Sequence, residues 1–494
     1  MTSFTQHSQR SVQHSSIAII GSGFSGTMVA VHLLRQASFP LTIYLIEANP
    51  AQFARGVAYS TDSACHLLNV PAANMSAFPN DPVHFLRWAK KKAAKGELNV
   101  PWQTESNTVT GTSFLPRGAY GDYLVELLDN AEHNAVANGV YLERKIDKAV
   151  ALRIEPKSVM IGLLNGEHLR VQKVVLALGN FPPGDPVIEN PVFYQSPRYF
   201  SNPWQRGVLQ ALLKTTSCVL IGSGLTMVDW AITLSNAGYQ GVIHTVSRRG
   251  VWPQEHKPHK PLAFSLDVQA KSPSVRAWLH EIRRYIRESD CDWRSVIDAL
   301  RPNIAILWTS LSLVERRRFL RHVRVYWDSH RHRLPPVVAE RLNELVRSGQ
   351  LQKHTGRIFS YQETEQGVEV LIKQRGLATA TTLSVSAVVN CSGAESNYRK
   401  LNNLFVTCLL RQQSIEPDPL ALGLNVGSDG ALIYSDGTHS ECLYTLGPPQ
   451  KGMFWETIAV PEIRVQAEQL ANTLLTHLPN LTSTVEPLSQ LETV

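Results

Sequence analysis

The chain lacks the features that mark disulfide-bonded, dithiol, metal-binding and membrane proteins. Its 494 residues include only 6 cysteines, scattered with no Cys-x-x-Cys pair, which argues against a disulfide framework and a dithiol reductase site. No apolar run approaches the roughly 20 residues that a membrane-spanning helix needs. His256 and His259 stand in a proline-rich loop without companion ligands, so we expect no metal site.

The first sixteen residues, rich in Ser, Gln and His, also lack an apolar core. Because a secretory signal peptide needs such a core, we expect residues 1–16 to form a disordered tail. With 43% hydrophobic and 18% charged residues, the chain as a whole has ordinary globular composition. These features, together with the scattered cysteines, predict a cytoplasmic protein with no membrane partner.

What the chain does contain is two glycine-rich turns, each placed between an apolar strand and a helical segment. The first, G-S-G-F-S-G, spans residues 21–26, and the second, G-S-G-L-T-M, spans residues 222–227. One such turn arises by chance, but two in the same context predict two bound dinucleotides. The pattern indicates an α/β fold with two Rossmann-like dinucleotide-binding domains.

The first turn has the residues that FAD or NAD requires. Gly21 permits the tight turn, Gly23 lets the backbone approach a pyrophosphate, and Gly26 allows the helix to pack on the sheet. Ser22 lies between the first two glycines, beside the helix end that attracts the pyrophosphate. The next strand ends in Glu47, 21 residues after Gly26, where a carboxylate binds a ribose diol and repels a 2′-phosphate. A plain βαβ turn without a ligand is the alternative.

The second turn differs in ways that favour NADPH. Met227 replaces the third glycine, which keeps the tight turn but loosens the contact of helix and strand. The following strand ends without an acid, and Ser247 stands 20 residues after Met227, in the ribose-reading position. A hydroxyl followed by two guanidinium groups suits a 2′-phosphate, although the arginines could also be solvated surface charges. The predicted NADPH-binding residues are Gly222, Gly224, Thr226, Ser247, Arg248 and Arg249.

Two later strands, which end in turns at Gly179 and Gly393, indicate a duplicated architecture. Each follows alternating, turn-punctuated sequence typical of a β-meander. The glycine-rich turns lie 201 residues apart and the later turns 214, so we expect one unit to be nested in the other. We predict a FAD-binding domain at 17–210 and 390–494 and an NADP-binding domain at 211–389, with Gly179 and Gly393 approaching the cofactors.

Between about residues 272 and 349 the sequence changes to long helical segments, which predicts a helical insertion. A basic cluster between Arg316 and Arg333 supplies much of the net charge of +7. We expect a solvated or salt-bridged face, and the alternative is that the cluster holds the NADP phosphate or an anionic substrate. No recognisable nucleic-acid-binding module accompanies it, so we expect no nucleic-acid partner.

Several irregular blocks carry a family resemblance. They are R-G-V-A-Y at 55–59, H-L-L-N-V-P-A at 66–72, M-S-A-F-P-N-D-P at 75–82, G-L-T-M-V-D at 224–229, S-R-R-G at 247–250 and W-E-T-I-A-V-P-E-I-R at 455–464. Over nearly its whole length the chain resembles the FAD/NAD(P)-binding proteins that include the FAD-dependent urate hydroxylase and the aspartate N-monooxygenase. The resemblance implies FAD on the first unit and NADPH on the second. It also implies that Trp455, Glu456 and Thr457 cap the flavin from a helix N-terminus, which would stabilise a reduced flavin.

The expected reaction follows from this cofactor pair. Without a dithiol pair or a metal to take the electrons of NADPH-reduced FAD, dioxygen is the expected acceptor. We predict a monooxygenase that hydroxylates a small polar nitrogenous substrate, urate-like or amino-acid-like, through a C4a-hydroperoxyflavin. The polar groups expected near the flavin are His66, Asn69, Arg117 and Tyr120, with Arg117 gripping an anionic substrate and His66 tuning proton delivery. A purely structural role is the alternative for each of the four.

Two other functions stay open at this stage. One is an NADPH-dependent flavin reductase or dehydrogenase with another electron acceptor, and the other is a non-enzymic sensor that has kept its nucleotides. Electron transfer to a dye without oxygen insertion would favour the first, and slow flavin reduction by NADPH would favour the second.

Overall fold

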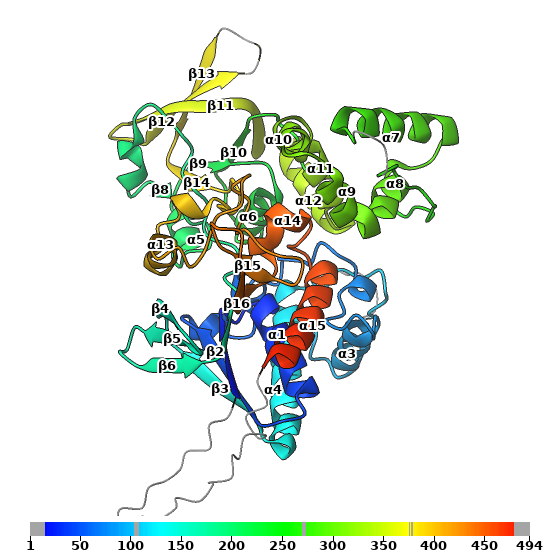
Figure 1. Ribbon diagram of the computed structural model, residues 1–494. Coiled ribbons are helices and arrows are strands. Elements are labelled where there is room, and N and C mark those ends of the chain that lie inside the picture. The colour runs from blue at the N-terminus through cyan, green and yellow to red at the C-terminus, as the bar shows by residue number, and fades with distance from the viewer. Residues whose placement is uncertain (1–14, 103–107, 269–272, 375, 377–378, 479–494) are drawn as a thin grey trace, which may run out of the picture.

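The computed structural model describes residues 15–102, 108–268, 273–374, 376 and 379–478. Two sheets with their helices form a lower and an upper half in Figure 1, and a group of helices lies beside the upper one. Residues 1–14 and 479–494, which hold most of the predicted tail and the end of the predicted FAD-binding domain, lie outside the described residues.

The lower sheet has six strands. Their spatial order is β15 (Ala431–Ile433), β16 (His439–Thr445), β7 (Lys173–Leu176), β1 (Ser15–Ile20), β2 (Leu41–Glu47) and β3 (Val140–Ile146). All neighbouring pairs are parallel except β15 with β16. Strand β1 is buried along its whole length, as is usual for a central strand of a parallel sheet.

Strand β1 begins two residues before the end of the predicted tail. Ser15 and Ser16 pair with Leu41 and Thr42 of β2. The backbone N–H of Ser16 also donates to Gln172 Oε1 at 2.6 Å. The prediction of disorder over residues 1–16 is therefore wrong for these two serines, because ladder hydrogen bonds hold polar residues that carry no hydrophobic signal.

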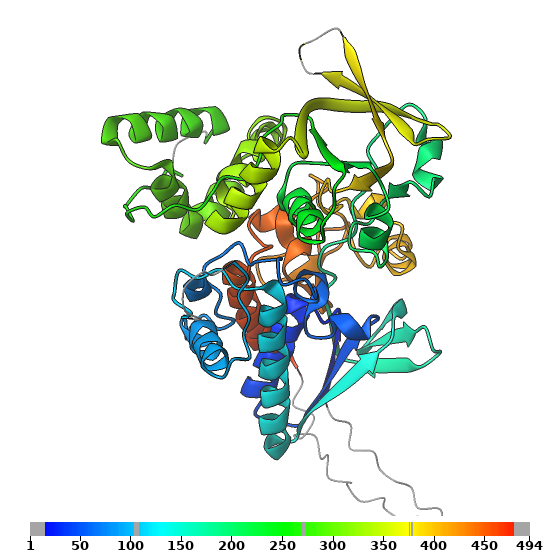
Figure 2. The same ribbon diagram turned by 180° about the vertical axis from the view of Figure 1, so that it is seen from behind.

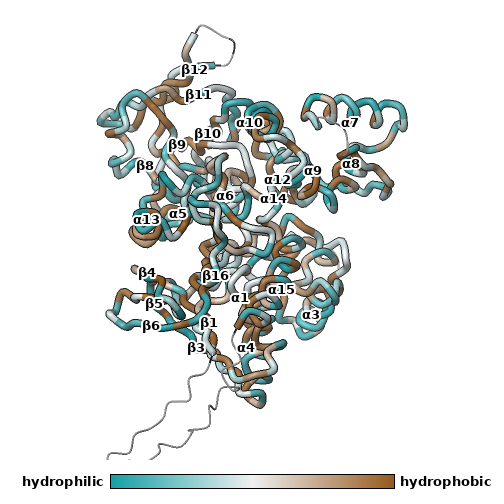
Figure 3. The backbone as a smooth tube through the Cα atoms, viewed as in Figure 1, coloured by the Kyte–Doolittle hydropathy of each residue, from teal (hydrophilic) through white to brown (hydrophobic). Residues whose placement is uncertain are grey.

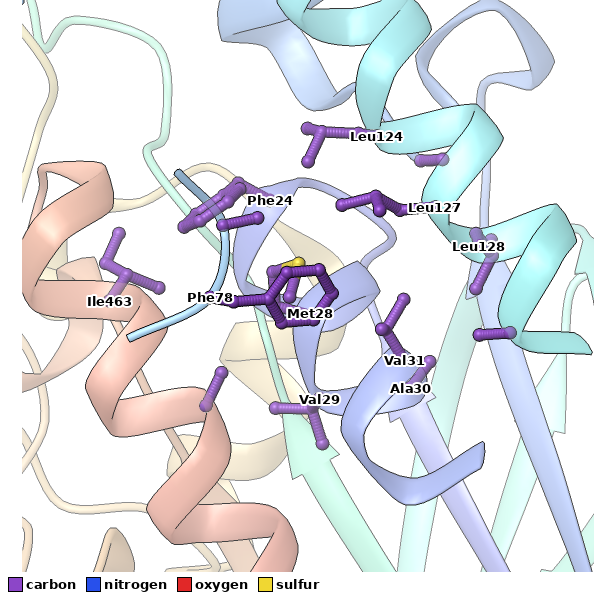
Figure 4. Packing of buried hydrophobic residues seen from close by; sticks show 14 of the residues in the cluster. Phe24, Met28, Val29, Ala30, Val31, Phe78, Leu124, Leu127, Leu128 and Ile463 are labelled. Atoms are coloured by element: carbon purple, nitrogen blue, oxygen red, sulfur yellow. The ribbon is translucent and has the colours of Figure 1, made fainter. Parts of the chain in front are cut away.

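Helix α1 (Phe24–Gln36) connects β1 to β2 and lies between α15 (Val460–His477) and α4 (Arg117–Ala135). Figure 4 shows Met28 and Val31 of α1 between Ile463 of α15 and Leu127 of α4. The first eleven residues of α1 are all buried. A helix enclosed in this way has a fixed N-terminus, which matters for the site described below.

The upper sheet has seven strands. Their spatial order is β13 (Ala380–Val385), β12 (Val368–Gln374), β11 (Leu351–Glu363), β10 (Val242–Ser247), β9 (Ser217–Ile221), β14 (Ala387–Asn390) and β8 (Tyr199–Phe200). The strands from β8 to β11 in this order are parallel, and β11, β12 and β13 are antiparallel. Helix α6 (Leu225–Asn236) connects β9 to β10 as α1 connects β1 to β2.

Both predicted meanders are present. Strands β4 (Ala149–Glu155), β5 (Ser158–Leu163) and β6 (His168–Val171) form a three-stranded antiparallel sheet before β7, and β11 to β13 precede β14. The predicted α/β class with two Rossmann-like units is confirmed. Strand β8, which the predicted boundary at residue 210 assigns to the first domain, instead pairs with β14 of the upper sheet. A two-residue strand is too short to leave a periodic signal, and the remaining boundaries stay a prediction.

The helical insertion lies to the right in Figure 1 and to the left in Figure 2. It comprises α7 (Val275–Ser289), α8 (Trp293–Leu300), α9 (Ile304–Ser310), α10 (Leu313–His322), α11 (Arg324–Arg331) and α12 (Pro336–Arg347). Figure 3 shows hydrophilic residues along much of α7 and α10. The shorter helices elsewhere are α2 (Gly56–Tyr59), α3 (His84–Ala94), α5 (Val208–Leu212), α13 (Leu404–Arg411) and α14 (Lys451–Phe454). Within the described ranges, no helix combines the length and apolar character needed to cross a membrane.

Candidate cofactor sites and the joint between the units

The first glycine-rich turn joins β1 to α1 and leaves no space for a side chain at Gly21 or Gly26. Gly21 has φ of +104°, and a Cβ there would overlap the carbonyl oxygen of Ala177, just after β7. A Cβ on Gly26 would overlap the Gly21 carbonyl oxygen in the same way. Gly23 is the N-cap of α1 and supplies no side-chain cap, so the first N–H groups of the helix remain available to an anion.

Glu47, at the end of β2, turns its carboxylate toward this turn. Its Oε2 accepts hydrogen bonds from the Ser22 backbone N–H at 3.2 Å and from the Ser22 hydroxyl at 3.3 Å. Its Oε1 accepts from the Asn49 N–H at 3.1 Å. The carboxylate thus faces the first turn, and the cofactor contacts of Ser22 and Glu47 stay predictions.

The second turn has the same close contact between its first glycine and a neighbouring backbone carbonyl as the first turn. Gly222 has φ of +113°, and a Cβ there would meet the carbonyl oxygen of Cys391, just after β14. Gly224 is the N-cap of α6, and a Cβ on it would meet no atom within 4 Å. Met227 is fully buried and belongs to the core on that side of the sheet. A methionine side chain therefore separates α6 from the sheet where Gly26 lets α1 pack directly.

The two arginines after β10 have different surroundings. Arg249 donates to the carbonyl oxygens of His322 at 2.9 Å and Arg321 at 2.5 Å, at the C-terminal end of α10. Arg248 is exposed, and no described residue forms a hydrogen bond or ion pair with it. The Ser247 hydroxyl accepts from the Gly250 N–H at 3.1 Å. The phosphate contact predicted for Arg249 is therefore unsupported, because its guanidinium binds α10, whereas that of Arg248 stays a prediction.

The turn after β7, at Gly179, and the turn after β14, at Gly393, lie next to each other at the boundary between the two units. Gly179 has φ of +61° and Gly393 has φ of +97°. Two residues beyond each, Phe181 and Glu395 form an antiparallel bridge, and the Glu395 N–H donates to Pro182 O at 3.3 Å. Both turns therefore reach the boundary of the two sheets, as expected if they approach two cofactors.

The segment predicted to cap the flavin stands just before the N-terminus of α15. Trp455 stacks on Trp308 of α9 with ring centroids 5.0 Å apart, and Glu456 Oε1 accepts from the indole N–H of Trp327 in α11 at 2.9 Å. These two side chains face the insertion, so their predicted flavin contact stays a prediction. Thr457 is fully buried, and its hydroxyl has no hydrogen-bond partner among the described residues.

Three of the four predicted catalytic residues, His66, Asn69 and Arg117, lie at the interface between the two units. The His66 ring contacts the hydroxyl groups of Thr61 and Thr233, with Nδ1–Oγ1 and Nε2–Oγ1 distances of 2.8 and 2.7 Å. Burial lowers the pKa of His66 below its ordinary value. The Asn69 carbonyl oxygen lies 3.0 Å from His256 Nε2. Arg117 forms an ion pair with Asp229 of α6, described below.

Tyr120 occupies a different place. Its ring is fully buried, 4.7 Å from the Tyr59 ring and 6.1 Å from the Phe24 ring, centroid to centroid. Burial raises the pKa of Tyr120 well above its ordinary value. Its hydroxyl has no hydrogen-bond partner among the described residues. An unpaired buried hydroxyl is costly, and the Tyr120 ring packs against the ring of Phe24, the first residue of α1.

The family comparison agrees with the first turn and its surroundings. Residues 18–181 match the model of the FAD-NAD(P)-binding family. No curated protein matches the chain.

Solved structures share the fold of this chain over most of its length. L-lysine 6-monooxygenase from Pseudomonas syringae has a TM-score of 0.62 and 17% identity, covering 94% of this chain and 100% of its own. The reduced form of ornithine hydroxylase from Pseudomonas aeruginosa has 0.61 and 16%, with 94% and 99% covered. The FAD-bound cadaverine monooxygenase from Erwinia amylovora has 0.62 and 13%, with 94% and 96% covered. At these identities the likeness concerns the fold.

Most of the basic cluster between Arg316 and Arg333 is bound by other groups of the chain. Arg316 Nε donates to Trp308 O at 2.9 Å at the end of α9, and Arg333 Nη2 lies 2.6 Å from Asp298 Oδ1. Arg331 is buried, with nitrogen–oxygen distances of 3.6 Å to Glu456 and 3.4 Å to Glu462. The salt-bridged face expected from the sequence is thus present, and Arg331 connects it to the segment at 455–464.

Sequence reasoning missed Asp229 and Thr233 of α6. Both are polar residues on a largely apolar helix, spaced four apart, and therefore share one face. That spacing was the available signal. The sequence could not show the contacts of these two residues, because their partners, His66 and Arg117, are more than 110 positions away in the chain.

Proposed function

We propose that the chain is an FAD- and NADPH-dependent monooxygenase that hydroxylates a nitrogen atom of a small amine. The observation that carries this proposal is the repeated geometry of the two turns. Gly21 lies against Ala177 in the first unit and Gly222 against Cys391 in the second, each at the N-terminus of a helix. A protein with two such turns can hold a flavin and a nicotinamide dinucleotide on adjacent units.

The first unit fits FAD. Its turn leaves helix N–H groups for the pyrophosphate, and Glu47 offers a carboxylate to the ribose. The unpaired buried hydroxyl groups of Thr457 and Tyr120 are further candidates for polar contact with the cofactor. When bound, FAD supplies the chemistry that takes hydride from NADPH and passes electrons to dioxygen. The chain's own part is to bind, orient and shield the reactants.

The second unit fits NADPH through its turn and through Arg248. In the first unit, β2 ends in the acid Glu47. In the second unit, β10 ends in Ser247 and offers no acid at that position. The exposed guanidinium of Arg248 offers two parallel N–H groups to a 2′-phosphate. An exposed side chain without an internal partner reaches a ligand at little cost to the fold.

A primary amine is the substrate class that we propose, in place of urate. The lysine, ornithine and cadaverine enzymes with this fold, named above, all act on small molecules that carry a primary amino group. Their likeness to this chain extends over both units and the segments between them, since 94% of the chain is covered. Cytoplasmic location, and partners limited to a small substrate and dioxygen with no nucleic acid, stay predictions.

The test is to purify the protein, record the flavin spectrum, and follow NADPH, oxygen and peroxide together. A panel of diamines and amino acids would be compared with their fully N-acetylated forms, in which no primary amine remains, and with urate. We expect a free amine to stimulate NADPH use with little peroxide, and the hydroxylated product to be detected by mass spectrometry. The acetylated form of the same amine should give no such product.

Three outcomes would contradict the proposal. Rapid reduction that no amine stimulates, with all oxygen recovered as peroxide and efficient transfer to a dye, would favour the flavin reductase alternative. Stimulation of NADPH use by urate alone would show that the substrate is urate-like and not a primary amine. A protein that retains no flavin after reconstitution would overturn the cofactor assignment.

A further inference from the structure

Arg117 and Asp229 form a bidentate ion pair across the interface between the two units. Arg117 Nη1 lies 2.7 Å from Asp229 Oδ2, and Nη2 lies 3.0 Å from Oδ1. The side chains are only 17% and 12% exposed. A bidentate pair of this kind fixes the relative orientation of its two partners as well as their distance.

Arg117 is itself held rigidly in the first unit. It is the first residue of α4, its backbone N–H donates to His66 O at 2.8 Å, and its Nε donates to Leu67 O at 3.0 Å. The guanidinium is therefore a fixed extension of the loop at residues 65–69. That loop belongs to the unit that we assign to FAD.

A second contact lies one helical turn farther along α6. Thr233 Oγ1 is 2.7 Å from His66 Nε2, and Thr233 follows Asp229 by four residues. Two anchor points at this spacing are about 6 Å apart along a helix. Because both anchors come from one loop, they determine the direction of α6 as well as its position.

Little empty space remains around this pair. The cavity at this place has a volume of only about 10 Å³, between Leu67 and Asn69 of one unit and Val228 and Val338 of the other. That is room for about one water molecule and none for a substrate. The Arg117 guanidinium is already paired with Asp229, so the geometry favours a positioning role over the predicted substrate contact.

We propose that Arg117 and Asp229 are positioning residues that set the NADPH unit against the FAD unit for hydride transfer. This inference rests on the proposed function. Helix α6 starts at the turn of Gly222 and Gly224, where the phosphates of NADPH are expected. A shift of α6 therefore moves the nicotinamide relative to the flavin, and hydride transfer is sensitive to misplacement of about 1 Å.

Three variants test the pair. Asp229→Asn and Arg117→Lys each remove the two-point geometry, and the double variant Arg117→Asp with Asp229→Arg reverses the charges. The measured quantities are FAD content, melting temperature, the limiting rate of flavin reduction at saturating NADPH, and the dissociation constant of NADPH. The exposed pair Arg341–Glu344 of α12 provides the matched control, Arg341→Gln.

We expect each single variant to lower the limiting rate by about 10-fold or more, with less than about 3-fold change in NADPH affinity. The reversed pair should recover part of the rate, because it restores the ion pair but not the hydrogen bond from Arg117 Nε to Leu67 O. Arg341→Gln should behave as the unchanged protein. A wild-type limiting rate in folded Asp229→Asn would overturn the inference, as would equal losses in rate and affinity.

Small-angle X-ray scattering supplies a readout that needs no turnover. If the pair fixes the units, the flavin-loaded single variants should have a larger radius of gyration than the unchanged protein, and the reversed pair should move back toward it. Identical scattering from all of these proteins would overturn the inference. If NADPH fails to reduce the unchanged protein, the proposed function fails while scattering still decides the role of the pair; if the single variants fail to fold, the reversed pair decides it.

Discussion

Arg249 Nη1 donates to the carbonyl oxygen of His322 at 2.9 Å and so ties the end of β10 to the end of α10. The neighbouring Arg248 has no such partner among the described residues and is exposed. Two adjacent arginines with the same predicted role therefore have different surroundings. One stabilises the insertion through the negative end of a helix dipole, and the other is available to a phosphate.

Replacement of Arg248 by alanine should weaken the binding of NADPH but not that of NADH. A charge-assisted hydrogen bond contributes about 1.5–3 kcal/mol, so we expect the KM for NADPH to rise about 10-fold or more with little change for NADH. Arg249→Ala should instead lower the melting temperature and leave the preference for NADPH largely intact. Steady-state kinetics with both coenzymes measures the ratio. An unchanged preference in Arg248→Ala would show that the 2′-phosphate lies elsewhere.

Replacement of Glu47 should weaken FAD retention. The carboxylate is held by Ser22 and Asn49 beside the first turn. Loss of a charged acceptor for the ribose diol should raise the FAD dissociation constant about 10-fold or more in Glu47→Ala. Equilibrium dialysis or fluorescence titration of the apoprotein gives the constant. Exposed Glu143 of β3, changed to Gln, is the control, and full FAD retention by Glu47→Ala would contradict the assignment.

The three glycines tested next differ in the space around them. Gly21→Ala combines positive φ with overlap on Ala177, and Gly26→Ala drives the new methyl group into the backbone of the turn. Each should lower the free energy of unfolding by about 3 kcal/mol or more. Gly224→Ala meets open space and should cost less than about 1 kcal/mol, yet weaken NADPH binding because backbone approaches the phosphates there. Denaturant unfolding checks the order, which equal losses in the three variants would contradict.

Acid should destabilise the fold in part through His256. Burial lowers the pKa of His256 to about 4 from its ordinary value of 6.5. The unfolded chain therefore binds a proton more readily than the folded one, and the stability present above pH 6.5 is lost as the pH falls toward about 4. His256→Gln, which keeps a donor for Asn69 O but does not titrate, should flatten the fall in melting temperature over this range. Exposed His133→Gln should leave the slope unchanged, and an equal slope in both variants would exclude His256.

The parts of this protein that could be predicted from sequence are those enforced by local backbone chemistry. Gly21 and Gly222 mark the turns because a side chain there would collide with the strand beside it. The alternation of the meanders and the position of Glu47 at the end of β2 are likewise properties of short segments. Each of these features depends on residues close together in the chain, so the sequence pattern carries it directly.

Contacts between distant segments were decided only by the tertiary structure. Arg117 and Asp229 are 112 residues apart, and nothing local distinguishes an arginine that binds substrate from one that binds a carboxylate on another unit. Trp455 turned toward the insertion, and Arg249 toward α10, for the same reason. The sequence by itself determined two dinucleotide-binding turns, because glycine is the residue that fits them. Folding decided how the units meet, because burial and pairing of side chains depend on which surfaces come together.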